Sequence, residues 1–165
     1  MKNRRLIISI LVLFFATVVI GLGIYLVQTR KGTEDEKLAN ARVLLNEIYA
    51  VTQTDQLEFL SLSNEQDMML WLETKFGKYM TKEGFEGAIR NRVLTRGILL
   101  IRDTNQQMTV KEIVIEERPG DTAANWYNYR VTLGFEDASE KNYSGALNVT
   151  AADSGWVVDK ITRIN

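Results

Sequence analysis

The reactive side chains of this sequence are acidic and phenolic, because its 165 residues include no His and no Cys. The missing imidazole removes the commonest general base and metal ligand. The missing thiol removes disulfides and thiolate metal sites. A carboxylate beside a phenol remains for acid–base catalysis, and the candidates are Asp103 and Asp159 with Tyr127 and Tyr129.

A structural role explains these four residues better than catalysis. Aromatic side chains at every second position are typical of a strand face that packs into a core. An Asp near a strand end is typical of a solvated turn. The sequence contains no nucleophile elbow and no phosphate loop. The acidic run 34–36 lacks the spacing and the glycine of a calcium loop. We therefore expect a non-enzymatic protein with no catalytic residue, metal or cofactor.

The segment 6–27 predicts a membrane-spanning helix, because it carries no charge over about 22 positions, and a bilayer core takes about 20 apolar residues. A cleaved signal peptide would have a shorter apolar region and a small-residue cleavage site. Here bulky residues follow Gly21 and Gly23, so we expect an uncleaved single span. Thr17 and Gly21 have the small-xxx-small spacing that lets helices approach, and they are the candidate helix–helix contact.

The charges beside this span predict its orientation. Residues 1–5 carry three basic side chains, whereas the segment after the span has two and then becomes acidic. The positive-inside rule then places 1–5 in the cytoplasm as a short tail. We expect a cell-membrane protein with a linker over 28–34 and an extracytoplasmic domain over 35–165.

The expected domain is acidic. Of the chain's 20 basic residues five lie in 1–31, so the remainder has 15 basic and 21 acidic residues, a net charge of −6. A nucleic-acid partner requires a basic surface, so we expect none. The same charge also serves solubility.

Helical signals dominate the first half of the domain. Apolar residues recur at helical spacing over about 35–60. Ser63 to Gln66 fits a capping box that opens a second helix, which Gly77 ends. Thr81 opens a third, short helix.

The pattern changes to a period of two from Thr95. The runs that we interpret as strands are 98–101, 110–117 with a bulge, 127–135, 143–151 and 156–164. In the last strand, Trp156 and Val158 should share one face, with Val157, Asp159 and Ile161 on the other. The order predicts an α+β fold, in which about three helices pack on one face of a curved four- to five-stranded antiparallel sheet behind the transmembrane helix.

The layout resembles a known superfamily. A long helix, two shorter helices and a run of strands ending in GWVVDKITRI are similar to the nuclear-transport-factor-like (cystatin-like) superfamily, over residues 35–165. Its membrane-anchored members include the VirB/TraM-type assembly factors of type IV secretion and conjugation systems. The resemblance implies a domain that scaffolds such an envelope complex. It also implies a cone-shaped cavity, so an alternative is a small-ligand-binding or sensory outer domain.

The candidate interaction surface is apolar. Met68, Met69 and Trp71 are near neighbours on the second helix, so they cannot all face the core. Trp156 is the further candidate. We expect contacts with membrane lipid and with other membrane or envelope proteins, a second copy of this chain included.

Overall fold

The structure is a computed structural model, and it describes residues 34–119 and 125–163. The chain divides into two compact units, residues 1–36 and residues 37–165. The α+β domain lies in the second unit. The expected tail 1–5, span 6–27, linker positions 28–33, Thr17 and Gly21 lie outside the described residues. Within the described part, no helix is both long and apolar enough to cross a bilayer.

The helices precede the strands. The first described helix covers 34–49 and is called helix 34–49 below. It is followed by α2 (Gln53–Ser61), α3 (Glu65–Phe76), the 3-10 turn η1 (Gly77–Tyr79), α4 (Lys82–Arg90) and α5 (Arg96–Thr104). The strands are β1 (Met108–Glu117), β2 (Trp126–Phe135), β3 (Glu140–Ala152) and β4 (Gly155–Arg163).

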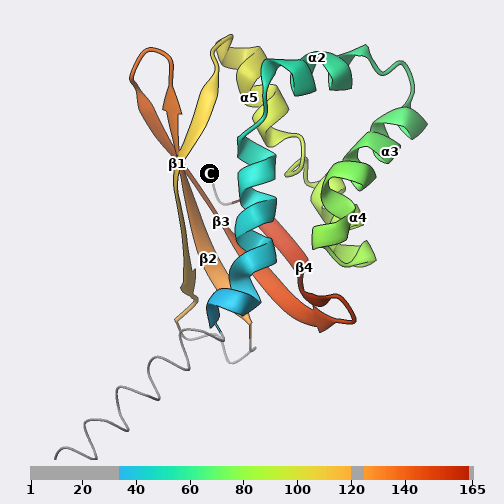
Figure 1. Cartoon of the computed structure of the whole chain (residues 1–165), viewed down its shortest axis with the longest axis vertical. Helices are drawn as coiled ribbons and strands as arrows, with labels where there is room; N and C mark the ends of the chain where they lie inside the picture. Colours follow the sequence, from blue (N-terminus) through green and yellow to red (C-terminus); the bar gives the residue numbers. More distant parts are fainter. Residues whose placement is uncertain (1–33, 120–124, 164–165) are drawn as a thin grey trace, which may run out of the picture. The chain divides into compact units, whose positions relative to one another are not determined.

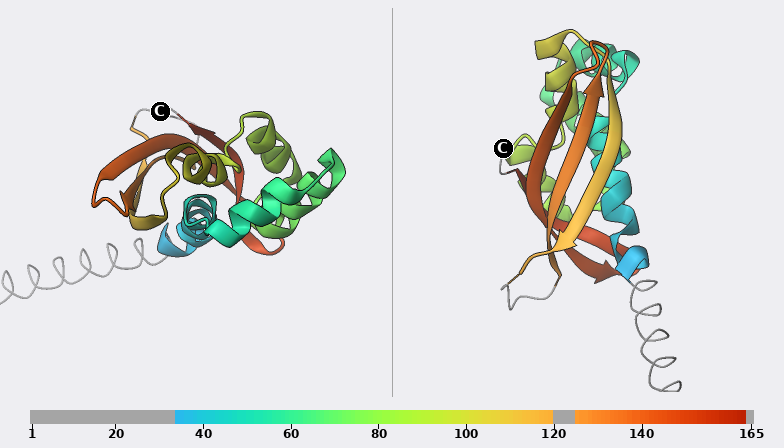
Figure 2. Two further views of the ribbon diagram at one scale, coloured as in Figure 1. Left: turned by 90° about the horizontal axis from the view of Figure 1, so that it is seen from above. Right: turned by 90° about the vertical axis from the view of Figure 1, so that its left-hand side faces the viewer.

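The four strands form an antiparallel meander in the order β1-β2-β3-β4. The sheet is curved, and the helices lie against one of its faces (Figures 1 and 2). Helix 34–49 supplies much of the core, with Leu44, Leu45 and Ile48 fully buried. The opposite wall comes from alternate residues of β2, among them Tyr127 and Val131. The predicted α+β class and the lower predicted strand number are confirmed.

The described residues contain five α-helices, so the expected number of about three is wrong. The predicted helix 35–60 breaks after Tyr49, because Thr52 starts a new helix there. The Thr52 side chain accepts from the backbone of Asp55, and the Asp55 side chain accepts from the backbone of Thr52. This capping box begins α2 although the apolar stripe continues through Val51. The next cap is one residue later than predicted, at Asn64 rather than Ser63.

The run 98–101 belongs to α5 and not to a strand. A short apolar run does not by itself distinguish a buried strand from a buried helix. Gly97 allows the helical solution, because a Cβ there would lie 2.2 Å from the carbonyl oxygen of Ile48. The helix ends at Asn105, whose left-handed conformation (φ 52°) stops the helical turn.

A bulge in β4 changes which of its side chains share a face. Val158 pairs with Val149 and Ile161 pairs with Leu147, so Asp159 is the extra residue. Val149 and Leu147 are two positions apart on β3, and their partners Val158 and Ile161 therefore both face the core. The predicted opposite placement of Ile161 is wrong, because strict alternation does not survive a bulge. The bulge predicted in the first long strand is confirmed between Val110 and Glu112.

Two glycines of α4 make a matched pair for testing how closely this helix packs on β4. A Cβ at Gly84 would lie 2.4 Å from the carbonyl oxygen of Asp159, whereas the nearest neighbour at Gly87 is the Arg90 side chain at 3.9 Å. We expect Gly84→Ala to lower the free energy of unfolding by about 1–3 kcal/mol through overpacking. Gly87→Ala should raise it by about 0.5–1 kcal/mol through helix propensity. Chemical denaturation of both variants measures this, and equal effects would contradict the close contact.

Candidate interaction groove

Exposed apolar side chains concentrate on α2 and α3. Four large hydrophobic residues of the described chain are exposed, and three of them lie on these two helices. They are Leu57 at 63%, Leu60 at 49% and Leu70 at 62% exposed. The fourth, Val43 at 41%, lies on helix 34–49. Exposed large apolar side chains on a solvent-facing surface are typical of an interaction site.

A groove runs between α2 and α3, and its volume is about 560 Å³. We call it the α2–α3 groove, and its lining residues are Asp55, Glu58, Leu62, Asp67, Leu70, Trp71, Thr74 and Lys75. Three of these are acidic and one is basic, so the lining carries a net charge of −2. The groove therefore combines apolar side chains with an acidic rim.

Aromatic packing joins the two helices beside this groove. The rings of Phe59 on α2 and Trp71 on α3 meet edge to face, with centroids 5.2 Å apart. Trp71 also contacts the buried ring of Phe76, at 6.3 Å. Such pairs stabilise beyond the area they bury. Trp71 is only half-buried, so it connects the groove to the core.

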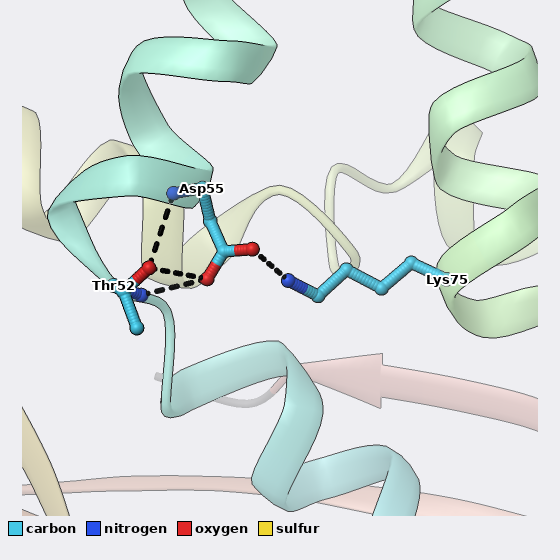
Figure 3. A network of polar contacts seen from close by, with 3 residues as sticks. All are labelled: Thr52, Asp55 and Lys75. Carbon is cyan, nitrogen blue, oxygen red and sulfur yellow. Dashed lines mark hydrogen bonds and ion pairs between the residues drawn. The ribbon is translucent and has the colours of Figure 1, made fainter.

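A polar cluster holds the same two helices together (Figure 3). The backbone N–H and the hydroxyl of Thr52 both donate to Asp55 Oδ2, at 2.9 and 2.7 Å. The Asp55 backbone N–H donates to Thr52 Oγ1 at 3.1 Å. Lys75 on α3 donates to the other carboxylate oxygen, Oδ1, at 2.5 Å. Asp55 thus caps α2 and ties it to α3 with one carboxylate.

These partners change the acidity of Asp55. Burial acts to raise the pKa of its carboxyl, but the hydrogen bonds from Lys75 and Thr52 outweigh burial, and the pKa lies below its ordinary value. Asp55 therefore stays ionised at neutral pH. Its charge offsets that of Lys75, which leaves Glu58 and Asp67 as the uncompensated charges of the groove.

The candidate residues on α3 divide between groove and core. Trp71 lines the groove. Met68 and Met69 are half-buried, and Met69 packs against the hydrophobic core. Leu70, between them and Trp71, is the most exposed residue of this run and was not predicted. The signal was present in five consecutive apolar residues, 68–72, since a helix cannot bury all of them.

Trp156 does not line the groove. It lies at the start of β4 and is half-buried against the core. Its carbonyl oxygen accepts from Asn40 Nδ2 at 2.7 Å, and Lys37 Nζ lies 4.9 Å from the centre of its ring. These contacts join β4 to helix 34–49, so the structure gives Trp156 a packing role. It is not brought together with Trp71.

The acid–base candidates have other partners. Asp159 accepts from the hydroxyl of Thr81 at 2.9 Å, and Asp103 pairs with Arg102 on the surface. The Tyr129 hydroxyl donates to the carbonyl of Thr162 at 3.1 Å. Burial raises the pKa of Tyr129, so it stays a neutral donor at physiological pH. Among the described residues, no group of three or more acidic side chains is placed to hold a metal ion.

Comparisons with known proteins do not assign this chain to a family. No family model matches it, and no curated protein matches it. One similar solved structure is a protein of unknown function from Bacteroides thetaiotaomicron VPI-5482, with 18% identity, a TM-score of 0.46, and coverage of 82% of this chain and 95% of that one. Another is a periplasmic fragment of TraM, with 12% identity, a TM-score of 0.47, and coverage of 80% and 97%. At these values neither structure assigns a family.

The carboxylate of Asp55 should stabilise the α2–α3 pair in a pH-dependent way. We expect Asp55→Asn to lower the free energy of unfolding by about 1 kcal/mol at pH 7, since it loses charged hydrogen bonds and an ion pair. The folded pKa is depressed, so this contribution is present above the unfolded pKa of about 3.9 and is lost as the pH falls through the folded value. Denaturation at pH 7 and at pH 3 measures it.

The matched control is Glu58→Gln, which removes an exposed charge from the same helix. Its effect should stay below about 0.5 kcal/mol at both pH values. If Asp55→Asn and Glu58→Gln behave alike, the carboxylate does not tie the two helices together.

Proposed function

We propose that this chain is a non-enzymatic, single-span membrane protein whose extracytoplasmic domain scaffolds the assembly of an envelope complex. The observation that carries the proposal is the α2–α3 groove, in which the exposed Leu70 and the half-buried Trp71 lie beside acidic residues. Exposed leucines next to a half-buried tryptophan are the residue types and the arrangement of a protein–protein contact.

The rest of the domain suits a rigid platform. One side of helix 34–49 is buried against the sheet, and α5 packs closely against this helix at Gly97. The α2–α3 pair is fastened to this platform through Trp71 and Phe76. A docking surface on a rigid support loses little conformational entropy when the partner binds. The expected span 6–27 would hold the platform beside the membrane.

The resemblance of the sequence to the VirB/TraM-type assembly factors favours a conjugative or type IV secretion apparatus as the complex. It rests on the order of helices before strands and on the closing GWVVDKITRI. The observed placement of the helices before four antiparallel strands supports that order, whereas the number of helices differs from it. Membrane lipid and envelope proteins are the proposed partners, and nucleic acid is not among them because the domain is acidic.

The interior of the domain speaks against the alternative of a small-ligand-binding or sensory domain. Such a domain needs a cavity lined by apolar and a few polar groups. Here Tyr49, Tyr127 and Tyr129 are at most 2% exposed and lie between helix 34–49 and the sheet. Tyr143 stacks on Tyr49 at 5.7 Å. These buried phenol rings support the scaffold over the ligand-binding alternative.

Co-purification of the tagged full-length chain from its own membranes tests the proposal. We expect other envelope proteins to accompany the wild type. The double variant Leu62→Glu with Leu70→Glu should reduce their recovery at least tenfold, because it places two charges in the lining of the groove. The matched control is Val43→Glu, which changes an exposed apolar residue outside the groove.

The Val43→Glu variant should co-purify with the same partners, in the same amounts, as the wild type does. Circular dichroism of all three proteins establishes that they are equally folded. Unchanged recovery with the double variant, or recovery of the wild type alone without partners, would contradict the proposal.

A further inference from the structure

We propose that the occupant of the α2–α3 groove is an amphipathic helix of a partner protein, with Lys or Arg residues flanking its apolar stripe. This inference rests on the proposed docking function and adds the chemistry of the partner. Its basis is the combination of helical walls, apolar lining side chains and a net negative charge in the lining.

The helical walls favour a helix over an extended peptide. A bound strand gains its affinity from main-chain hydrogen bonds to a free sheet edge. The walls of this groove are α2 and α3, whose interior backbone groups bond within their own helices. Only side chains are therefore available for recognition. A helix laid between two helices meets such a surface by packing ridges into grooves.

The apolar side chains define the stripe of the partner. Leu62, Leu70 and Trp71 line the groove. The α3 wall has 12 residues, which corresponds to about 18 Å at a rise of about 1.5 Å per residue. A partner helix of about three to four turns matches this length. Its anchors would recur at i, i+3 or i+4, and i+7.

The charges of the groove select basic flanks. Lys75 is held by Asp55, so its charge is already compensated within the groove. Glu58 is exposed. Within the described residues, the Asp67 carboxylate accepts a hydrogen bond only from the neutral side-chain amide of Asn64, at 2.7 Å. Both carboxylates thus remain available to a cation on the partner. The net charge of −6 over residues 32–165 adds a field that attracts a basic segment and repels an acidic one.

The same charges disfavour two other occupants. A second copy of the acidic domain would bring like charges together at the groove, and like charges across an interface cost affinity. Anionic lipid headgroups would meet Glu58 and Asp67 with the wrong sign. Both occupants are outcomes of the test below.

The test uses the full-length chain in nanodiscs of zwitterionic phosphatidylcholine and three fluorescent 14-residue peptides. The first has leucines at i, i+3, i+7 and i+10 with flanking lysines, the second has glutamates in place of the lysines, and the third scrambles the first. Fluorescence anisotropy measures binding, with empty nanodiscs as the background. We expect the lysine peptide to bind at least tenfold more tightly than either of the others, and to weaken as salt rises.

A charge-reversed variant makes the test specific to the groove. Glu58→Lys with Asp67→Asn changes the lining charge from −2 to +1, because one acid becomes a base and another becomes neutral. It should weaken the lysine peptide at least tenfold and strengthen the glutamate peptide. Val43→Glu should leave both affinities unchanged.

The outcomes separate this inference from the proposed function. If no peptide binds, or if the glutamate or scrambled peptide binds as well as the lysine peptide, the helical basic partner is wrong. The docking function then still stands when Leu62→Glu with Leu70→Glu removes the partners from the membrane preparation. Self-association of the chain that the same double variant abolishes, or binding that appears only with anionic lipid, would also overturn the inference.

Discussion

The structure depends on the burial of helix 34–49 against the curved sheet. Leu44, Leu45 and Ile48 are fully buried there, and the tyrosines of β2 meet them from the other side. Fully burying one such aliphatic side chain contributes roughly 2 kcal/mol. Leu72 and Phe76 of α3 join this core, whereas α2 adds no fully buried apolar side chain. Both helices bury only a small part of their surface and keep leucines exposed to solvent.

The exposed surface of α2 and α3 follows from how little each of them buries. Gln56 is the only residue of α2 that counts as buried, and α3 buries Leu72 and Phe76. Both helices nevertheless carry leucines on their outer sides. A capping box, an aromatic pair and the ion pair from Lys75 hold them in place. Polar and aromatic contacts thus hold α2 and α3 together while leucines of both helices remain exposed.

Local chemistry predicted much of the fold. The helix start at Thr81 and the alternation of β2 depend on nearby residues, and the structure has both. Two features depended on partners distant in sequence. Run 98–101 becomes helical where Gly97 approaches Ile48, and the β4 bulge at Asp159 adjoins Gly84 of α4. The two residues of each pair are far apart in the sequence, so local patterns do not reveal the contact. The sequence predicted part of the site, because Trp71 was a candidate and Leu70 was not. Tertiary packing alone decides which residue of an apolar run stays exposed.

The central claim is that α2 and α3 present the surface on which another protein docks. Site-specific photocrosslinking in native membranes tests it most directly, with benzoylphenylalanine placed at Leu70 in one protein and at Arg130 in another. Arg130 is exposed on the face of β2 opposite to the core. The account predicts a discrete crosslinked protein adduct from position 70 and none from position 130. Adducts from position 130 alone would contradict it, because they would place the partner on the outer face of the sheet.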